Sequence, residues 1–207
     1  MADLCGFPVI HWVLKRVSLA KTLDQVVLTT SEAERDDLLI GVAKDLGLNT
    51  FRFEHEDDVL GRFCGAAKAA GAATVLRVCA DNPVVDPEFI DHAVCSFSES
   101  EADYAFNHIP RLDNGYPDGL GAEICSMETL KKLHSLANRP EHREHLLALV
   151  SSGFLHISFL ASTALAQPEV WKIVCYHGVE KFFQEKWLFQ NHLVRIHHLI
   201  TFDFCRL

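Results

Sequence analysis

Apolar residues in the first part of the chain follow two periods, one typical of short buried strands and one typical of amphipathic helices. The expected helices span residues 7–20, 31–46 and 57–71, and the expected strands span residues 26–30, 50–53 and 74–79. Three strand-then-helix units in succession indicate an α/β fold. We therefore predict a mostly parallel sheet covered by helices on both faces.

Local residue types mark where several of these elements begin and end. Ser31 and Glu34 have the spacing of a capping box, which satisfies backbone donors in the first turn of a helix. The pair Asp57-Asp58 favours a helix start, because acidic groups are stabilised near a helix N-terminus. Gly47 and Gly71 are expected to end the second and third helices, since glycine accepts the left-handed backbone of a C-terminal cap.

The rest of the chain continues the mixed pattern. We expect helices at 87–97, 126–136 and 140–150, and strands at 103–107 and from Glu123 onward. Beyond Val150 the pattern weakens, although residues 171–174 and 194–204 fit strands and residues 179–188 fit a helix. No repeat, low-complexity tract or linker interrupts the chain, so we expect a single domain over residues 1–207.

The strand at 74–79 and the helix at 87–97 are joined by the polar turn Ala80-Asp81-Asn82-Pro83. A carboxylate at the carboxyl end of a parallel strand lies where open α/β sheets bind ligands, and it suits a hard cation such as Mg²⁺. Asp, Asn and Pro are also ordinary turn formers, so a purely structural turn is the alternative.

A long loop at 108–121, rich in Pro and Gly, is the second candidate functional segment, because long loops in compact domains commonly carry function. Glu123 follows this loop and brings a carboxylate toward whatever the loop covers, unless it is an edge-strand carboxylate in water. The run Arg143-Glu144-His145 is the third candidate, with a solvated helix face as its alternative.

Composition excludes several classes of protein. With 28 acidic and 19 basic side chains, the chain has a formal charge of −9 and no basic run, so nucleic-acid binding is not expected. Seven scattered cysteines without a Cys-x-x-Cys pair indicate free thiols and a cytoplasmic location. The uncharged stretch at 146–166 is diluted by Ser, Gly and His, so we expect no membrane span.

Six segments, in this order, resemble motifs of the cytidylyltransferases of surface-polysaccharide synthesis. They are residues 23–31, 57–62, 77–83, 103–107, 116–123 and 143–145. The resemblance is closest to the spore-coat polysaccharide type, related to acylneuraminate and 3-deoxy-manno-octulosonate cytidylyltransferases. Six matches in sequence, spread over about residues 7–150, make chance similarity improbable. The resemblance implies a Rossmann-like nucleotidyltransferase fold.

The family couples CTP to an acidic sugar, and the resemblance assigns roles to residues of this chain. A sugar oxygen attacks the α-phosphate and pyrophosphate leaves, so catalysis is positioning plus charge neutralisation by Mg²⁺ and cationic groups. Asp81 is implied as the Mg²⁺ ligand, with Arg62 as a further catalytic residue. Arg77 is implied as an anion contact, although its place in mid-strand fits an internal ion pair equally well. The remaining implied substrate-binding residues are Asn82, Tyr116, Asp118, Gly119, Glu123 and His145.

The chain departs from the family pattern at both ends. The family's first strand and phosphate-binding loop would precede Met1, and Phe7 stands where the family has a lysine, so we expect an N-terminally truncated domain with the first strand missing. Asp203 resembles a second metal ligand, with an ordinary turn residue as the alternative. Two functions are therefore expected: transfer of CMP to an acidic sugar, or an inactive remnant that keeps sugar or partner binding. A homodimer is compatible with both.

Overall fold

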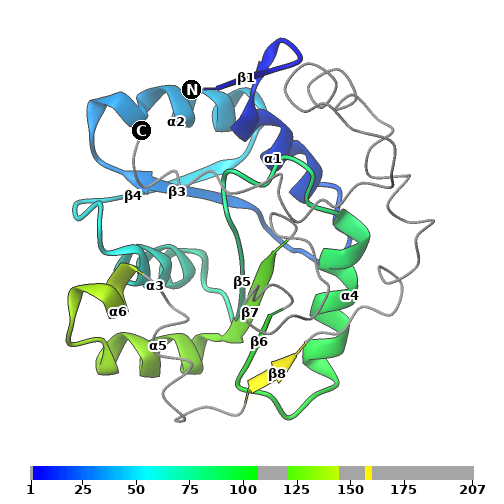
Figure 1. Ribbon diagram of the computed structural model, residues 1–207, viewed down its shortest axis with the longest axis vertical. Helices are drawn as coiled ribbons and strands as arrows, with labels where there is room; N and C mark the ends of the chain where they lie inside the picture. Colours follow the sequence, from blue (N-terminus) through cyan, green and yellow to red (C-terminus); the bar gives the residue numbers. More distant parts are fainter. Residues whose placement is uncertain (1, 107–120, 145–156, 160–207) are drawn as a thin grey trace, which may run out of the picture.

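The computed structural model describes residues 2–106, 121–144 and 157–159, and all structural statements concern these residues (Figure 1). The helices are α1 (Val9–Val17), α2 (Asp37–Asp45), α3 (Val59–Ala70), α4 (Pro87–Ser98), α5 (Met127–Leu136) and α6 (Pro140–Glu144), with a 3₁₀ turn, η1, at Glu34–Asp36. The strands are β1 (Asp3–Leu4), β2 (Phe7–Pro8), β3 (Val27–Ser31), β4 (Asn49–Phe53), β5 (Thr74–Val78), β6 (Tyr104–Phe106), β7 (Ala122–Ser126) and β8 (Ile157–Phe159).

The strands form two larger sheets and one small hairpin. β3 and β4 pair in parallel, and the second sheet has the order β5-β7-β6-β8. β6 and β8 are parallel, whereas β7 runs antiparallel to both of its neighbours, β5 and β6. The predicted α/β class is confirmed, but the second sheet is mixed rather than mostly parallel. An antiparallel neighbour requires no crossover helix, which is why counting strand-then-helix units did not reveal it.

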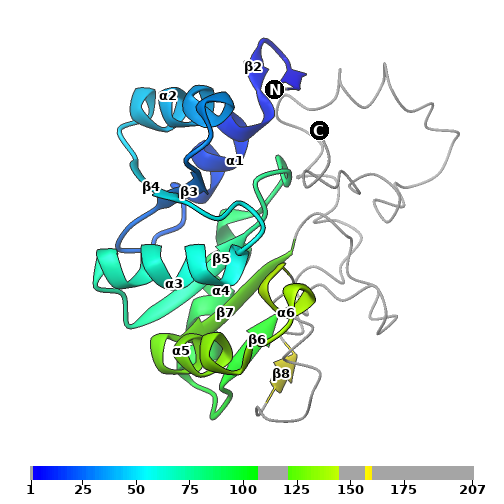
Figure 2. The ribbon, with the colours of Figure 1, turned by 90° about the vertical axis from the view of Figure 1, so that its left-hand side faces the viewer.

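Helices cover both faces of the second sheet, as predicted. Figure 1 shows α4 on one side of β5 and β7, with α3 and α5 on the other. Figure 2 shows α1 and α2 beside the β3–β4 pair. Side chains of α1, α2 and α4 share one apolar cluster with Leu28 of β3, and Leu76 and Val78 of β5 pack against the same cluster. The two sheets therefore lie under a common helical layer.

The end signals of α3 and α4 are confirmed. The Asp58 carboxylate accepts the N–H of Gly61 at the start of α3, and Gly71 closes that helix with φ 65°. Asp86 caps α4 by accepting the N–H of Glu88, next to Pro87 at the first helical position. These signals are local in sequence, which explains why they were readable without tertiary information.

Two local predictions were wrong in detail. Ser31 does not cap a helix: it ends β3, and its hydroxyl donates to the Asp36 carboxylate across η1. The first helix begins at Val9 rather than Phe7, because residues 3–8 fold back as the β1–β2 hairpin. The two turn residues of this hairpin, Cys5 and Gly6, have the positive φ angles of 53° and 83°.

Several expectations fall outside the described residues. They are the strands at 171–174 and 194–204, the helix at 179–188, and the part of the 140–150 helix beyond Glu144. In the part of the chain that the structure describes, no helix is long and apolar enough to cross a membrane. Cys64, Cys95 and Cys125 are free thiols, as the scattered cysteine pattern predicted.

Candidate functional site

The turn after β5 holds Asp81 at the carboxyl end of the strand, where the sequence placed it. The Asn82 backbone N–H donates to the Cys79 carbonyl at 3.2 Å, and the Asn82 carbonyl accepts the Val85 N–H at 3.2 Å. Asn82 is buried, whereas Asp81 is half-buried. These backbone bonds fix the turn that carries Asp81.

The Asp81 carboxylate fits the chemistry of Mg²⁺, which binds hard oxygen ligands and commonly takes one or two carboxylates plus substrate phosphates and water. Within residues 2–106, 121–144 and 157–159, no group of three or more His, Cys, Asp or Glu side chains is placed to hold a metal ion.

Arg77 and Glu123, two of the sequence-predicted substrate residues, are brought together in the second sheet. They are cross-strand partners in β5 and β7, and Arg77 Nη1 lies 2.8 Å from Glu123 Oε1. The Tyr104 hydroxyl, on β6, donates to Glu123 Oε2 at 2.5 Å. The ion-pair alternative for Arg77 matches this geometry. Glu123 is only 3% exposed, because β7 lies between β5 and β6 rather than at an edge.

Burial shapes the electrostatics of this triad, Arg77–Glu123–Tyr104. Desolvation alone would lower the pKa of Arg77, but the Glu123 carboxylate outweighs it and raises that pKa above its usual value. Burial, followed by the Glu123 charge, raises the pKa of the Tyr104 hydroxyl well above its usual range. Near neutral pH the arginine is therefore charged and the tyrosine keeps the proton that it donates.

The side chains around the triad are mostly apolar. A small cavity is lined by Phe63, Val75, Arg77, Tyr104, Glu123, Cys125 and Leu130. The Arg77 guanidinium lies 6.0 Å from the centroid of the Phe63 ring, a cation–π distance. Burial, with the Glu123 charge as the second cause, raises the pKa of the Cys125 thiol to about 12. The cavity is thus lined mostly by apolar side chains, with the Arg77–Glu123 ion pair at its wall.

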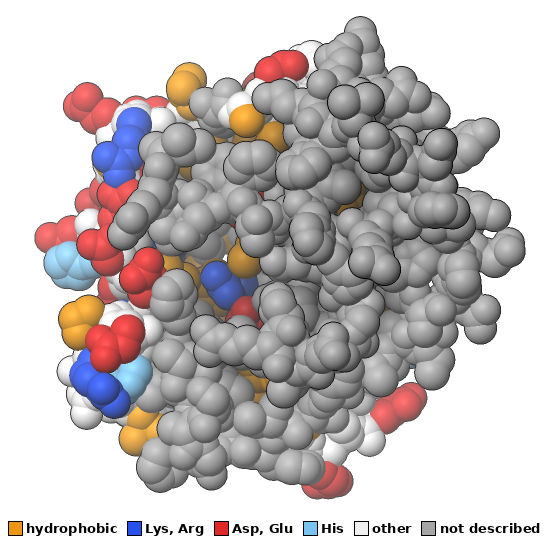
Figure 3. Space-filling model, in the orientation of Figure 1, with side chains coloured by type: hydrophobic (Ala, Val, Ile, Leu, Met, Phe, Trp, Pro, Cys, Tyr) orange, Lys and Arg blue, Asp and Glu red, His pale blue; other side chains and the backbone are white. Residues whose placement is uncertain are grey.

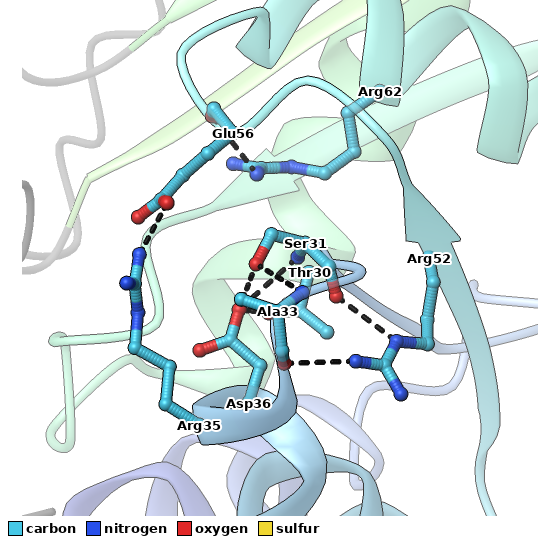
Figure 4. Close-up of polar contacts among 8 residues, drawn as sticks. All are labelled: Thr30, Ser31, Ala33, Arg35, Asp36, Arg52, Glu56 and Arg62. Carbon is cyan, nitrogen blue, oxygen red and sulfur yellow. Dashed lines mark hydrogen bonds and ion pairs between the residues drawn. The ribbon is translucent and has the colours of Figure 1, made fainter.

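A second polar cluster lies at the carboxyl end of β3 (Figure 4). The hydroxyls of Thr30 and Ser31 each donate to Asp36 Oδ2 at 2.6 Å. Arg52, from the neighbouring strand β4, donates to the Ser31 carbonyl at 3.0 Å and to the Ala33 carbonyl at 2.9 Å. These bonds fix the turn from β3 into η1 and place a guanidinium beside it.

Arg62 extends from the first turn of α3 toward Glu56, and its Nη1 donates to the Glu56 carbonyl at 3.3 Å (Figure 4). The Glu56 carboxylate pairs with Arg35. Sequence analysis singled out Arg62 but missed Arg35 and Arg52. The signal for Arg52 was its place between Phe51 and Phe53, a charged residue inside an apolar strand. The cationic groups lie near the ends of β3 and β4, a usual position for anion binding in α/β folds.

Charged side chains are mixed in sign on the face shown in Figure 3. Acidic groups lie among Lys and Arg along the margin where Figure 1 has α2 and α3. The five remaining candidate residues, Tyr116, Asp118, Gly119, His145 and Asp203, lie outside the described residues.

Comparison with known protein families identifies the family of this chain. A family model described as Cytidylyltransferase matches residues 1–154, which include the Asp81 turn and both polar clusters. The chain belongs to the cytidylyltransferase family. The match ends beyond α6, so the looser sequence pattern after Val150 coincides with the end of the family-like part.

Two curated proteins are similar to this chain in sequence. The chain is 32% identical over 138 residues to the spore coat polysaccharide biosynthesis protein SpsF of Bacillus subtilis, which covers 66% of this chain and 55% of that protein. It is 26% identical over 105 residues to a 3-deoxy-manno-octulosonate cytidylyltransferase of Aliivibrio fischeri, covering 51% of this chain and 42% of the relative. The chain spans about half the length of the curated relatives it matches.

Solved structures show the same fold. A cytidylyltransferase from Leptospira borgpetersenii serovar Hardjo-bovis superposes with a TM-score of 0.72 at 24% identity, covering 78% of this chain and 68% of that one. A CMP:2-keto-3-deoxy-manno-octonic acid synthetase complexed with CTP gives a TM-score of 0.61 at 14% identity, with coverage of 89% and 91%. The Rossmann-like nucleotidyltransferase fold is confirmed.

Proposed function

We propose that this chain transfers CMP from CTP to an acidic sugar, of the nonulosonic or ulosonic type, for cell-surface polysaccharide synthesis. The observation that carries the proposal is the position of Asp81, half-buried in the turn at the carboxyl end of β5 and inside the segment matched by the cytidylyltransferase family. The names of the relatives support the substrate class, since one acts in spore coat polysaccharide biosynthesis and another on 3-deoxy-manno-octulosonate.

In the proposed reaction a sugar hydroxyl oxygen forms a bond to the α-phosphorus of CTP. The bond from that phosphorus to the bridging oxygen of the β-phosphate breaks, pyrophosphate leaves with the electron pair, and the hydroxyl proton is lost to solvent. Little covalent chemistry falls to the protein in such a transfer, so positioning and charge neutralisation dominate.

Asp81 is the residue proposed to hold Mg²⁺, with Asp203 as the second expected ligand. Bound there, the metal would supply positive charge to the phosphate oxygens. Asn82 is buried next to Asp81 in the chain, and its backbone bonds stabilise the turn. Asn82 is therefore proposed to support the nucleotide side of the site.

Arg62 is proposed to neutralise charge on the nucleotide phosphates from the start of α3. Arg77 is proposed to act through Glu123, the buried carboxylate with which it pairs at 2.8 Å. Glu123 then lies at the wall of the sugar side, where Tyr116, Asp118, Gly119 and His145 are also expected. The cytoplasmic location and the homodimer stay predictions.

The test is release of pyrophosphate from CTP with Mg²⁺ and a panel of sugar acids that includes 3-deoxy-manno-octulosonate. The expected result is one pyrophosphate and one CMP-sugar per turnover, with GTP inactive and Asp81→Asn inactive. Absence of pyrophosphate with every sugar would contradict the proposal. Sugar binding without turnover would instead favour the inactive remnant with a sugar-binding or partner-binding role.

A further inference from the structure

The carboxylate of Asp58 accepts hydrogen bonds from two helices, α3 and α6. Its partner on α6, Arg143, is 85 positions further along the chain. Asp58 Oδ1 accepts the Gly61 N–H at 2.8 Å and so caps α3. Its Oδ2 accepts Nη1 of Arg143, from α6, at 3.2 Å. The two side chains are 22% and 30% exposed, which places the ion pair at the partly buried contact between the two helices.

Arg143 is held from three directions. Besides Asp58, its Nε donates to the Ala137 carbonyl at 3.1 Å, and its Nη1 lies 3.0 Å from Nε2 of His134 on α5. An arginine has no acceptor, so the guanidinium is the donor in this contact with the His134 ring. A rigid guanidinium fork that meets three fixed acceptors has little freedom. Arg143 therefore lies on a docked helix face rather than the solvated one considered from the sequence.

Arg143 anchors the described part of α6. The structure describes this helix over Pro140–Glu144, with Arg143 as its fourth residue. Arg143 bonds it to the start of α3 and to α5. Loss of the charge on Asp58 would leave this arginine with two neutral acceptors in a partly buried position, where hydrogen bonds to charged partners are the stronger ones.

Gly61 provides independent support for a closely fitted Asp58. A Cβ atom built on Gly61 would lie 2.4 to 2.9 Å from the atoms of the Asp58 carboxyl group, closer than real contacts allow. A side chain at position 61 would therefore require the Asp58 carboxylate to shift from its present position. The next residue, Arg62, is the proposed phosphate contact.

We infer that Asp58 is a positioning residue that sets α6 against the start of α3. This inference rests on the proposed function, because it connects Arg62, assigned to the nucleotide side, with α6, which carries the candidate residue Arg143. In this arrangement Asp58 touches neither substrate. It fixes how α6 lies against the start of α3.

The deciding variant is Asp58→Asn, because asparagine still caps a helix but carries no charge for Arg143. Asp86→Asn is the matched control: Asp86 caps α4, which has the same length of 12 residues as α3. The readout is solvent exchange of the Arg143 Nε–H in ¹⁵N-arginine-labelled protein, with the signal assigned through Arg143→Lys. We expect exchange to become about tenfold faster in Asp58→Asn, in line with the loss of one charge-assisted bond, and unchanged in Asp86→Asn.

Kinetics with CTP and 3-deoxy-manno-octulosonate separate positioning from general stability. Asp58→Asn should raise KM for the sugar acid by about tenfold while KM for CTP changes by less than about twofold, because α3 stays capped and α6 does not stay fixed. Equal losses for both substrates, or an unchanged Nε–H exchange rate, would overturn the inference. If the wild type shows no turnover, the proposed function fails, and the exchange measurement still decides whether Asp58 positions Arg143.

Discussion

Two polar clusters use the same residue types in very different surroundings. The triad Arg77–Glu123–Tyr104 lies inside the second sheet, where Glu123 is 3% exposed. The pair Arg35–Glu56, near the end of β3, joins side chains that are 63% and 56% exposed. Both contain an arginine paired with a glutamate. They differ in their exposure to solvent rather than in the charged groups that pair.

The comparison separates groups that determine stability from groups that remain available to a ligand. A buried ion pair cannot lose one partner without leaving an uncompensated charge in a poorly hydrated interior. An exposed pair exchanges its partner for water at little cost. Arginines at the surface end of β3 and β4 can therefore change partners during binding, whereas Arg77 stays bound to Glu123.

The largest effect is expected for Glu123→Gln. This substitution removes the charge that pairs with Arg77, so we expect a loss of about 3–5 kcal/mol in the free energy of unfolding, measured with urea. The double variant Arg77→Met with Glu123→Leu removes both charges and should recover most of that loss. A loss below about 1 kcal/mol for Glu123→Gln would show that the pair is hydrated and that the comparison is wrong.

Tyr104→Phe should have the next largest effect. The hydroxyl donates to the charged Glu123 at 2.5 Å, and hydrogen bonds to charged groups contribute about 1.5–3 kcal/mol to stability. Urea unfolding of the single variant and of Tyr104→Phe with Glu123→Gln forms a double-mutant cycle. Strictly additive effects would show that the hydroxyl does not interact with this carboxylate.

Asp36→Ala should have a smaller effect that depends on pH. Burial pushes the pKa of Asp36 upward, but hydrogen bonds from Ser31 and Thr30 outweigh it, so the folded-state pKa lies below the usual value. Its contribution is then complete above the ordinary aspartate pKa and is lost as pH falls through the folded-state value. We expect a difference of about 1 kcal/mol from wild type near pH 7, shrinking in acid. A difference that does not change with pH would refute this sign.

Arg35→Ala should have the smallest effect. Its partner Glu56 is exposed, so no measurable change in the urea midpoint is expected. Added salt should not change the difference in urea midpoint between the variant and wild type. A clear destabilisation would mean that the ion pair near the end of β3 contributes to stability in the same way as the pair inside the sheet.

Local signals accounted for most of the described fold. Helix starts at Asp58 and Pro87 and a helix end at Gly71 were predicted because each depends on residues within one turn of the boundary. The Asp81 turn was placed correctly at the end of β5 for the same reason. The capping box was misread because the Ser31 hydroxyl donates to Asp36, a competition that spacing alone does not reveal.

Contacts between segments far apart in the chain could not be predicted from the sequence. The register that places Arg77 opposite Glu123 depends on antiparallel pairing of β5 with β7, and Arg143 meets Asp58 across 85 positions. Arg77, Glu123 and Arg143 were identified as candidate residues and Asp58 as part of a helix start, but their partners were not predicted. An arginine in mid-strand predicts a counter-charge without saying which carboxylate supplies it.

The most direct test of the nucleotide site is calorimetric titration of CTP into the chain, with Mg²⁺ and then with EDTA, because it requires no knowledge of the sugar. The proposal predicts binding in about the micromolar range with Mg²⁺, lost in EDTA and in Asp81→Asn, whose melting temperature stays close to that of wild type. Absence of binding with Mg²⁺, or binding that persists in EDTA and in Asp81→Asn, would contradict the assignment of Asp81 as the residue that brings Mg²⁺ to the nucleotide.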